Sequence, residues 1–303
     1  MKKAVVFGGA GFLGSHVADA LTDAGYGVTV FDIRPSPWLR ENQKMIVGDI
    51  LDAEKVAEAV SGCEVVYNFA GIADIDEARR RRLDSIKCNV LGNASILEAC
   101  HQASVSRYIF ASSLYVYSKS GSFYRSTKQA CELFIENYHD LFGIPYTILR
   151  YGSLYGPRAD NGNFIESILK QAIEEGVIVR EGNGEEIREY IHIFDAARFS
   201  VDILAPEFAN EHVIITGNQQ MKIKDLLQMI QELMDNRVKV KYVSPKHTYH
   251  YQITPYTFAP KIARRLVSKS YLDLGQGILS SIERIYEELN PPSPSYRIAE
   301  NLR

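Results

Sequence analysis

The sequence predicts an α/β protein built on a doubly wound parallel sheet, with a second, smaller mixed α/β domain beside it. Two features carry this prediction. Short apolar runs rich in β-branched residues alternate with longer helical patterns, and a glycine-rich turn joins the first run to the first helix. Continuous apolar strands separated by helices are typical of a parallel sheet covered on both faces, and right-handed crossovers give the doubly wound arrangement.

The first half of the chain supplies most of this sheet. Strands are expected over Ala4–Phe7, Val28–Phe31, Met45–Val47, Val65–Phe69, Tyr108–Ala111 and Tyr146–Leu149. Helices are expected between them, over Phe12–Ala24, Ala53–Val60, Asp84–His101 and Tyr124–Leu141. Asp52 stands directly before the second of these helices, where an aspartate side chain can cap free backbone N–H groups.

The regular alternation of strands and helices ends after Arg150, where a loop rich in glycine, asparagine and proline begins. Further helices are expected over Phe164–Glu175, Leu226–Met234 and Ile278–Leu289, and further strands over Val177–Val179, Val213–Thr216 and Val238–Val243. The strand Val213–Thr216 should join the main sheet, and a polar tail opened by "PPSPS" should end the chain. We expect a main domain of residues 1–160 plus about 190–218, and a second domain of about 161–189 plus 219–303.

Composition narrows the function classes. The chain has 303 residues and a formal net charge of -3, which argues against nucleic-acid or anionic-membrane partners. Four glycines interrupt the apolar stretch at the N-terminus and no long apolar run follows, so neither a signal peptide nor a membrane span is expected. The four cysteines form no CxxC pair, which argues against a metal site and fits a cytoplasmic protein.

The stretch "VVFGGAGFLGSH" follows the first predicted strand and opens the first helix. It contains Gly9-x-Gly11-x-x-Gly14 and also Gly8-x-x-Gly11-x-x-Gly14. In such a turn one glycine allows the tight bend, another lets the backbone approach a pyrophosphate, and a third lets the helix pack on the strand. A purely structural turn is the alternative, but the strand, the helix and a following acid are all in place. The stretch therefore predicts a dinucleotide site of the Rossmann type.

Asp32 ends the second predicted strand, eighteen residues after Gly14. A carboxylate at this distance bonds the ribose hydroxyls of NAD and repels the 2′-phosphate of NADP, so NAD is the expected cofactor. Arg34 works against this assignment, since an arginine there can accommodate a phosphate. Asp49 closes the third strand, where it either meets the adenine amino group or simply ends the strand; its spacing leaves both readings open.

Three tyrosines stand in "SSLYVYSKSGSFYRSTK", and the sequence must choose between them. Tyr124 and Lys128 are four residues apart at the start of a predicted helix, so both side chains project from one face. Tyr115 and Tyr117 lie just past a strand end and lack a lysine at this spacing. An ammonium nearby favours the phenolate form of a tyrosine, which gives a base suited to an alcohol that loses hydride. Ser113, near the carboxyl end of its strand, could hold the same substrate oxygen, although the spacing alone would also fit a surface pair.

Taken in order, several motifs resemble those of the extended short-chain dehydrogenase/reductase family, in particular its nucleotide-sugar epimerase/dehydratase branch. They are "GGAGFLG", "NFAG", "NVLG", "SSLYVY", "YRSTK", "LRYGSLYGPR" and "GNGEEIREYIHIFDAA". The resemblance extends to about Gly217 and implies that Ser113, Tyr124 and Lys128 are catalytic. It implies cofactor contacts from Gly8, Gly11, Phe12, Leu13, Asp32, Ile33, Asp49, Ile50, Ala70, Asn89, Lys128 and Tyr151. It implies substrate contacts from Ser113, Ser153 and Arg188, and an arginine suits the phosphate oxygens of a nucleotide diphosphate.

Three departures from the family pattern bear on the sugar site. The catalytic serine and tyrosine are only eleven residues apart, with a short "KSGS" loop where sugar-nucleotide members usually carry a longer one. Ser153 stands in place of the family's asparagine, and Asn68 where a histidine is common. Dehydratases and decarboxylases of this branch place acids just after the serine, whereas this chain has Leu114 and Tyr115, which argues against both activities.

Other conspicuous charged and histidine residues are expected to have structural roles or to lie on the surface. The run Arg79–Arg82 predicts a solvated helix face, although it could border the substrate entrance. His192 is expected to be structural, because no G-x-S-x-G motif accompanies it. The helices expected over 84–101 and 124–141 carry more apolar residues than one face needs, and the resemblance implies that they form a homodimer interface.

The sequence therefore predicts an NAD-dependent epimerase of a nucleotide-diphosphate sugar, acting at C4 of the hexose through a keto intermediate. A nucleotide-sugar 4-ketoreductase is an alternative that Asp32 disfavours, and a dehydratase is one that the residues after Ser113 disfavour. A non-catalytic NAD(P)-sensing protein on the same fold is a further alternative. Such proteins tend to lose the tyrosine–lysine pair, which this chain keeps.

Overall fold

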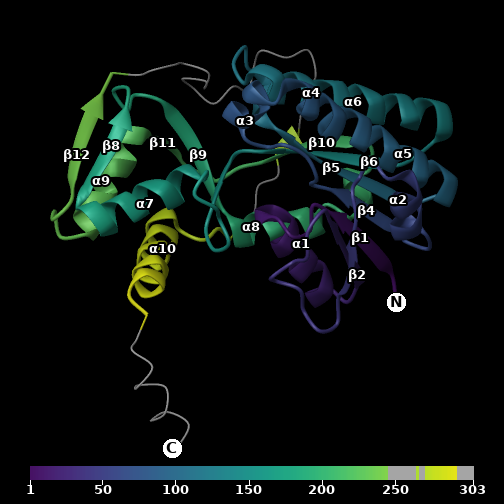
Figure 1. The fold of residues 1–303 in the computed structure, drawn as a ribbon, viewed down its shortest axis with the longest axis horizontal. Helices are drawn as coiled ribbons and strands as arrows, with labels where there is room; N and C mark the ends of the chain where they lie inside the picture. Colours follow the sequence, from purple (N-terminus) through teal and green to yellow (C-terminus); the bar gives the residue numbers. More distant parts are fainter. Residues whose placement is uncertain (245–263, 266–269, 292–303) are drawn as a thin grey trace, which may run out of the picture.

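The computed structural model describes residues 1–244, 264–265 and 270–291. The predicted polar tail lies outside these residues, apart from Pro291. The main sheet is parallel throughout, in the order β13-β10-β6-β5-β4-β1-β2-β3 (Figure 1). Its strands are β1 Lys3–Phe7, β2 Gly27–Asp32, β3 Lys44–Val47, β4 Val65–Asn68, β5 Arg107–Ser113, β6 Tyr146–Tyr151, β10 Glu211–Ile215 and β13 Arg264–Arg265. The strand order runs outward in both directions from β1 and β4, so the predicted doubly wound fold is confirmed.

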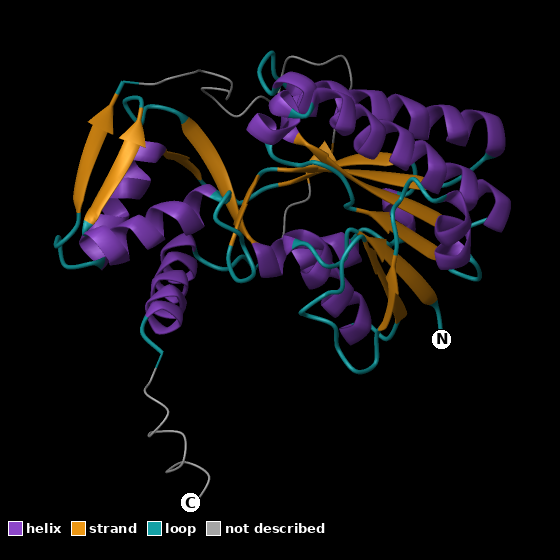
Figure 2. Cartoon of the chain, viewed as in Figure 1, coloured by secondary structure: helices purple, strands orange, loops and turns teal. Residues whose placement is uncertain are grey.

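Helices cover both faces of this sheet (Figure 2). On one face α1 (Phe12–Asp23) packs against α8 (Ile193–Asp202); α2 (Ala53–Val60), α5 (Gly92–Ala103) and α6 (Ser122–Phe142) pack on the other. Strand β1 shows why both faces are buried. Its Ala4 and Val6 belong to the first core and its Val5 and Phe7 to the second, because successive side chains of a strand point to opposite faces.

Several boundaries follow the sequence closely. The helices α2 and α7 (Phe164–Glu175) span the predicted residues, and the side chain of Asp52 caps α2 by accepting a hydrogen bond of 3.2 Å from the Lys55 N–H. Strand β10 joins the main sheet as predicted. Several elements were not predicted. Among them are α3 (Ile75–Arg80), the 3-10 turn η2 (Leu114–Tyr117), β7 (Ser153–Tyr155), α8, β11 (Gln220–Lys222) and β13.

The helix expected over 84–101 is present, but its middle is π-helical and not α-helical. The chain instead forms α4 (Arg82–Ser85), a π-helical segment η1 (Ile86–Leu91) and then α5. Asn89 in η1 explains the widened turn. Its side-chain amide donates to the Ile72 carbonyl and to Thr127 Oγ1, each at 3.0 Å, while its own carbonyl accepts a 3.1 Å bond from Cys131 Sγ. These lateral contacts replace regular helical bonding, as is common where π-helical turns serve a site.

A second region lies beside the main sheet, on the left of Figure 1. It contains the sheet β11-β9-β7, with β9 Ile187–His192 and β11 Gln220–Lys222, and the pair β12-β8, with β8 Val177–Glu181 and β12 Lys239–Val243. The helices α7, α9 (Ile223–Leu233) and α10 (Leu274–Leu289) surround these strands. This region has a core of its own, which includes Leu169, Ile178, Leu226 and Ile278. The domain boundaries stated above remain a prediction. Within the residues described, no helix is long and apolar enough to cross a membrane.

Candidate active site

The glycine turn between β1 and α1 has the geometry that a pyrophosphate site needs. Gly8 adopts a φ of +74°, and a Cβ there would lie 2.7 Å from the backbone N of Ala70. A Cβ on Gly14 would collide with the carbonyl oxygen of Gly8. The helix α1 begins at Phe12, directly after the turn, and no side chain caps it within the described part of the chain. Its first N–H groups therefore suit the phosphates of a dinucleotide.

Asp32 lies at the end of β2 and holds this turn. Its Oδ2 accepts a hydrogen bond of 3.0 Å from the Ala10 N–H, and its Oδ1 accepts one of 3.3 Å from the Arg34 N–H. The neighbouring Ile33 is exposed. The carboxylate therefore lies beside the glycine turn, where the ribose of NAD would be bound. The residues present thus fit NAD, which would be held by the glycine turn, Asp32 and Lys128.

We expect the protein to bind NAD more tightly than NADP by about tenfold or more, because Asp32 would repel a 2′-phosphate. Titration of both cofactors measures the difference in affinity. Asp32→Ala should reduce the preference for NAD over NADP. Asp32→Asn, which removes the charge but keeps a hydrogen-bonding oxygen, should reduce this preference as well. Equal binding of both cofactors by the wild type would mean that Arg34 outweighs the carboxylate.

The loops after β3 and β4 border the same end of the sheet. Asp49 Oδ1 accepts a 3.0 Å bond from the Leu51 N–H, so this carboxylate shapes its own turn, and Ile50 packs onto Gly92 of α5. Ala70 contacts the glycine turn, as described. Both amide hydrogens of Asn89 are used within the protein, so this residue shapes the site by holding the loop at Ile72.

The three predicted catalytic residues lie on β5 and on α6, which contact each other through Lys128. Ser113 is the last residue of β5 and is buried, while Tyr124 and Lys128 follow one another along the first turns of α6. The Nζ of Lys128 lies 5.8 Å from the centre of the Tyr124 ring and donates a 2.6 Å hydrogen bond to the carbonyl of Ala111 in β5. This hydrogen bond joins β5 to α6 beside Tyr124 and Lys128.

Burial lowers the pKa of Lys128 to about 8, with Cys131 and Glu132 partly opposing the shift. An amine is protonated below its pKa, so Lys128 remains mostly an ammonium at pH 7. Burial also raises the pKa of the Cys131 thiol to about 12, so that thiol stays neutral. A positive charge fixed beside Tyr124 favours the phenolate that the proposed base needs.

The other two tyrosines of this stretch have different surroundings. The hydroxyl of Tyr117 accepts a hydrogen bond from Arg150, whose guanidinium carbon lies 4.6 Å from the centre of the Tyr117 ring. Burial raises the pKa of Tyr117. Tyr115 is half-buried, and its ring meets the ring of Tyr124 edge-on, with centres 6.1 Å apart. Tyr117 is therefore a core residue. Tyr115 packs against Tyr124, the tyrosine that the sequence predicts to be the base.

Three further site residues lie along β6, β7 and β9. The Tyr151 side chain points into the core and its hydroxyl lies 2.6 Å from Ser200 Oγ, so the side chain has a structural role that the sequence did not reveal. Ser153 begins β7 and pairs with Tyr190 of β9. Arg188 precedes Tyr190 by two residues, is largely buried and donates a 2.9 Å bond to the Ile187 carbonyl.

The arginine run 79–82 and His192 have the surface and structural roles that the sequence predicts. Arg81 forms ion pairs with Glu77 at 2.6 Å and Asp84 at 3.1 Å on an exposed helix face. His192 caps α8 through Nδ1, which accepts a 3.3 Å bond from the Phe194 N–H. Burial lowers the pKa of His192 to about 4, so it is neutral and structural. The described residues contain no His, Cys, Asp and Glu cluster suited to a metal ion.

Comparisons with known sequences agree with this geometry. A putative UDP-glucose 4-epimerase of Methanocaldococcus jannaschii is 27% identical, over 90% of this chain and 95% of its own length. UDP-N-acetyl-alpha-D-glucosaminuronate decarboxylase of Bacillus cytotoxicus is also 27% identical, over 82% of this chain and 85% of its own.

Solved structures of nucleotide-sugar epimerases have the same fold. UDP-glucose 4-epimerase of Thermotoga maritima with UDP-glucose has a TM-score of 0.82 at 24% identity, and the match covers 95% of this chain and 99% of that one. A variant of UDP-glucuronic acid 4-epimerase of Bacillus cereus, in complex with a UDP-sugar and NAD, has a TM-score of 0.80 at 25% identity, with coverage of 95% and 99%. Residues 4–216 match the NAD dependent epimerase/dehydratase family over more than half of the chain. The protein is thus an NAD-dependent enzyme of short-chain dehydrogenase/reductase type, and it belongs to the NAD dependent epimerase/dehydratase family.

Proposed function

We propose that this enzyme epimerises a nucleotide-diphosphate sugar at C4 of the hexose, with UDP-sugars the first candidates. The observation that carries the proposal is the Tyr124–Lys128 pair of α6, whose lysine bonds to the Ala111 carbonyl of β5, the strand that ends at Ser113. Leu114 and Tyr115 follow the serine directly in the sequence. This set supports oxidation and reduction of an alcohol. The related proteins named as 4-epimerases of UDP-sugars, one of them solved with NAD, support the same choice.

The chain's own groups would divide the proton chemistry between them. Tyr124 as phenolate removes the proton of the sugar hydroxyl and returns it at the end of the cycle. Ser113 donates a hydrogen bond to the same oxygen while it becomes a carbonyl. Lys128 keeps a positive charge beside Tyr124 and binds the cofactor ribose. NAD, when bound, would supply the hydride acceptor for the sugar carbon and the hydride donor for the opposite face, so the cycle would consume no external reductant.

The decisive assay supplies candidate UDP-sugars without added NADH or NADPH. We expect a product of unchanged mass and inverted configuration, formed without net NADH. A product that gains a hydride and a proton, and only when a reduced cofactor is supplied, would replace the proposal with the ketoreductase. Loss of water or carbon dioxide would identify a dehydratase or a decarboxylase.

The decarboxylase deserves comparison because one relative carries that name. In this chain Leu114 is almost fully buried and Tyr115 packs against the ring of Tyr124. Neither residue can serve as an acid or base at pH 7 in the way a carboxylate would. The surroundings of Ser113 therefore favour epimerisation over elimination or decarboxylation.

Arg188 is proposed to bind the substrate diphosphate. Arg188→Ala should weaken binding of a UDP-sugar by about tenfold to a hundredfold, since charged hydrogen bonds of an arginine are worth about 1.5–3 kcal/mol. NAD binding should change little. Calorimetric titration with UDP and, separately, with NAD measures both effects. Equal loss of both affinities, or a lower melting temperature, would assign Arg188 a structural role.

We also propose that the enzyme is a cytoplasmic homodimer, formed through α5, α6 and η1. Leu91 of η1 is 58% exposed, and Leu133 and Phe134 of α6 are 55% and 41% exposed, which leaves an apolar face. Light scattering at micromolar concentration should give the mass of a dimer. Leu133→Asp should give a monomer, whereas Leu289→Asp on α10, also a surface leucine, should not. A monomeric wild type would remove this proposal without affecting the reaction.

A further inference from the structure

The segment between β2 and β3 begins one residue after Asp32 and is exposed along nearly its whole length, from residue 33 to residue 42. A cofactor whose ribose is bound by Asp32 would lie beside the start of this segment, because chain continuity places Ile33 and Arg34 there. The segment carries Trp38, the only tryptophan of the protein. What holds the segment in place therefore bears on how the cofactor is held.

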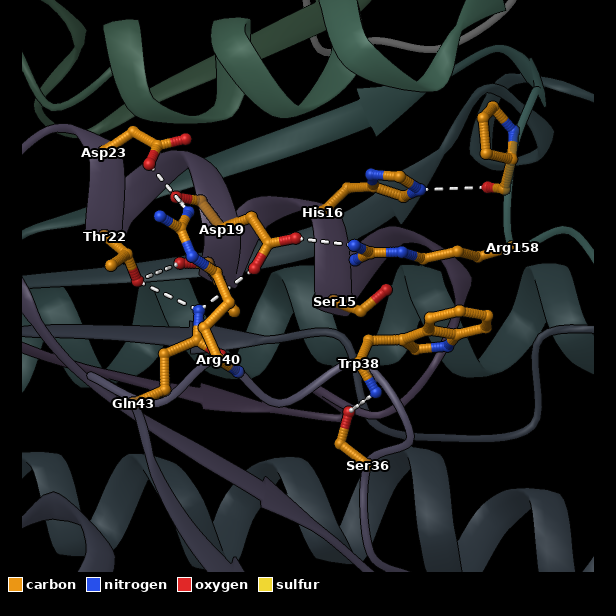
Figure 3. A network of polar contacts seen from close by, with 12 residues as sticks. Ser15, His16, Asp19, Thr22, Asp23, Ser36, Trp38, Arg40, Gln43 and Arg158 are labelled. Atoms are coloured by element: carbon orange, nitrogen blue, oxygen red, sulfur yellow. Dashed lines mark hydrogen bonds and ion pairs between the residues drawn. The ribbon is translucent and has the colours of Figure 1, made fainter. Parts of the chain in front are cut away.

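Several side-chain contacts attach the segment to α1, and two of them involve the carboxylate of Asp19 (Figure 3). At its end, Gln43 Nε2 donates to Asp19 Oδ1 at 3.1 Å and to Thr22 Oγ1 at 3.0 Å. At its middle, the Trp38 ring stacks on Arg158, whose guanidinium carbon lies 5.0 Å from the ring centre. Arg158 in turn forms a 2.7 Å ion pair with Asp19 Oδ2. One carboxylate thus joins both attachments.

The backbone of Arg158 is strained in the position where its side chain contacts Asp19 and Trp38. It follows β7, in the loop that leads to α7, and its φ of +66° is one that residues other than glycine rarely adopt. Its Nη1 is buried and has no hydrogen-bond partner among the described residues. The preceding Pro157 carbonyl accepts a hydrogen bond of 2.9 Å from His16 Nε2 of α1. Such strained conformations persist where the surrounding contacts over-determine the geometry, and they gather at functional positions.

We propose that Arg158 is a positioning residue that closes the segment 33–42 over the NAD site and thereby slows release of the cofactor. The ion pair to Asp19 is only about one-fifth exposed, so solvent screens it less than a surface pair. It fixes the guanidinium, and the fixed guanidinium attracts the face of the Trp38 ring. Release of NAD requires the segment to move, so it requires this stack to open. The proposal uses the cofactor site alone and does not depend on which sugar reaction the enzyme performs.

Release of NADH, followed through its own fluorescence after mixing with excess NAD, tests the proposal without a sugar substrate. Arg158→Ala should release NADH about tenfold faster, which corresponds to about 1.4 kcal/mol. Trp38→Leu should do the same, because it removes the stack and leaves the ion pair intact. Trp38→Phe should restore much of the slow release, since phenylalanine still offers a ring face. In Arg158→Ala, the emission of the single tryptophan should shift to longer wavelength even without cofactor.

Arg40→Ala is the matched control. Arg40 lies on the same segment, pairs with Asp23 at 2.7 Å and donates a 3.4 Å bond to the backbone carbonyl of Asp19, but both contacts are exposed and neither involves the Asp19 carboxylate or the Trp38 ring. It should leave the release rate unchanged. The proposal is overturned if Trp38→Leu releases NADH at the wild-type rate, or if Arg40→Ala accelerates release as much as Arg158→Ala. Should Arg158→Ala fail to fold, Trp38→Leu decides the question, because Trp38 is itself exposed.

Discussion

Replacing Tyr124 with phenylalanine is expected to lower kcat by about 100- to 10,000-fold, the range that loss of a general base produces. The ring and its contact with Tyr115 remain, and only the hydroxyl that carries the proton is lost. Lys128 would stay bonded to the Ala111 carbonyl, so NAD binding should change little. Turnover of the epimerised sugar and a parallel NAD titration measure both effects.

The neighbouring tyrosines provide the controls. Tyr115→Phe keeps the aromatic contact with Tyr124 and should retain much of the activity. Tyr117→Phe removes the hydroxyl that accepts a bond from Arg150, so it should lower stability more than turnover. If Tyr117→Phe were the inactive variant and Tyr124→Phe remained active, the assignment of the base would be wrong.

Replacing Glu132 with alanine is expected to cost about 3–5 kcal/mol of unfolding free energy, the loss typical when one partner of a buried ion pair is removed. Glu132 of α6 accepts bonds of 2.6 and 3.0 Å from Arg150 of β6 and one of 2.5 Å from Ser112 of β5. The side chains of Glu132 and Arg150 are only 6% and 2% exposed. Removal of the carboxylate would leave a charged guanidinium buried without its partner. Urea denaturation monitored by circular dichroism measures the loss.

Two variants distinguish this mechanism from a mere loss of packing. The double variant Glu132→Met with Arg150→Met should recover much of the stability, because it removes both charges and fills the space. Arg81→Ala breaks an exposed pair with Glu77 and should change the free energy of unfolding by no more than about 1 kcal/mol. A loss below about 1 kcal/mol for Glu132→Ala would contradict the picture of a buried, dry pair.

Much of this protein was readable from local patterns. The apolar runs predicted the strands of the main sheet, and the helices α2 and α7 begin and end where their periodicity and capping residues indicated. The glycine turn was readable because its positive φ and close backbone contacts exclude other residues. The spacing of Tyr124 and Lys128 was sufficient to place both on one face of α6, since a helix repeats every 3.6 residues. In each case the determining interactions lie within a few residues of one another.

Only the tertiary structure decided which polar groups meet across the fold. Arg150 donates to the hydroxyl of Tyr117, which lies 33 residues away in the chain, and Asn89, in the π-helical middle of the helix expected over 84–101, binds Ile72 and Thr127 from other parts of the chain. The ion pair between Arg158 and Asp19 joins residues 139 positions apart. Hydrogen bonds and ion pairs act over a few ångströms of space whatever the separation along the chain, so local spacing carries no record of them. Packing around the sheet brings such partners together, and with them the surroundings of Tyr124 and of the cofactor.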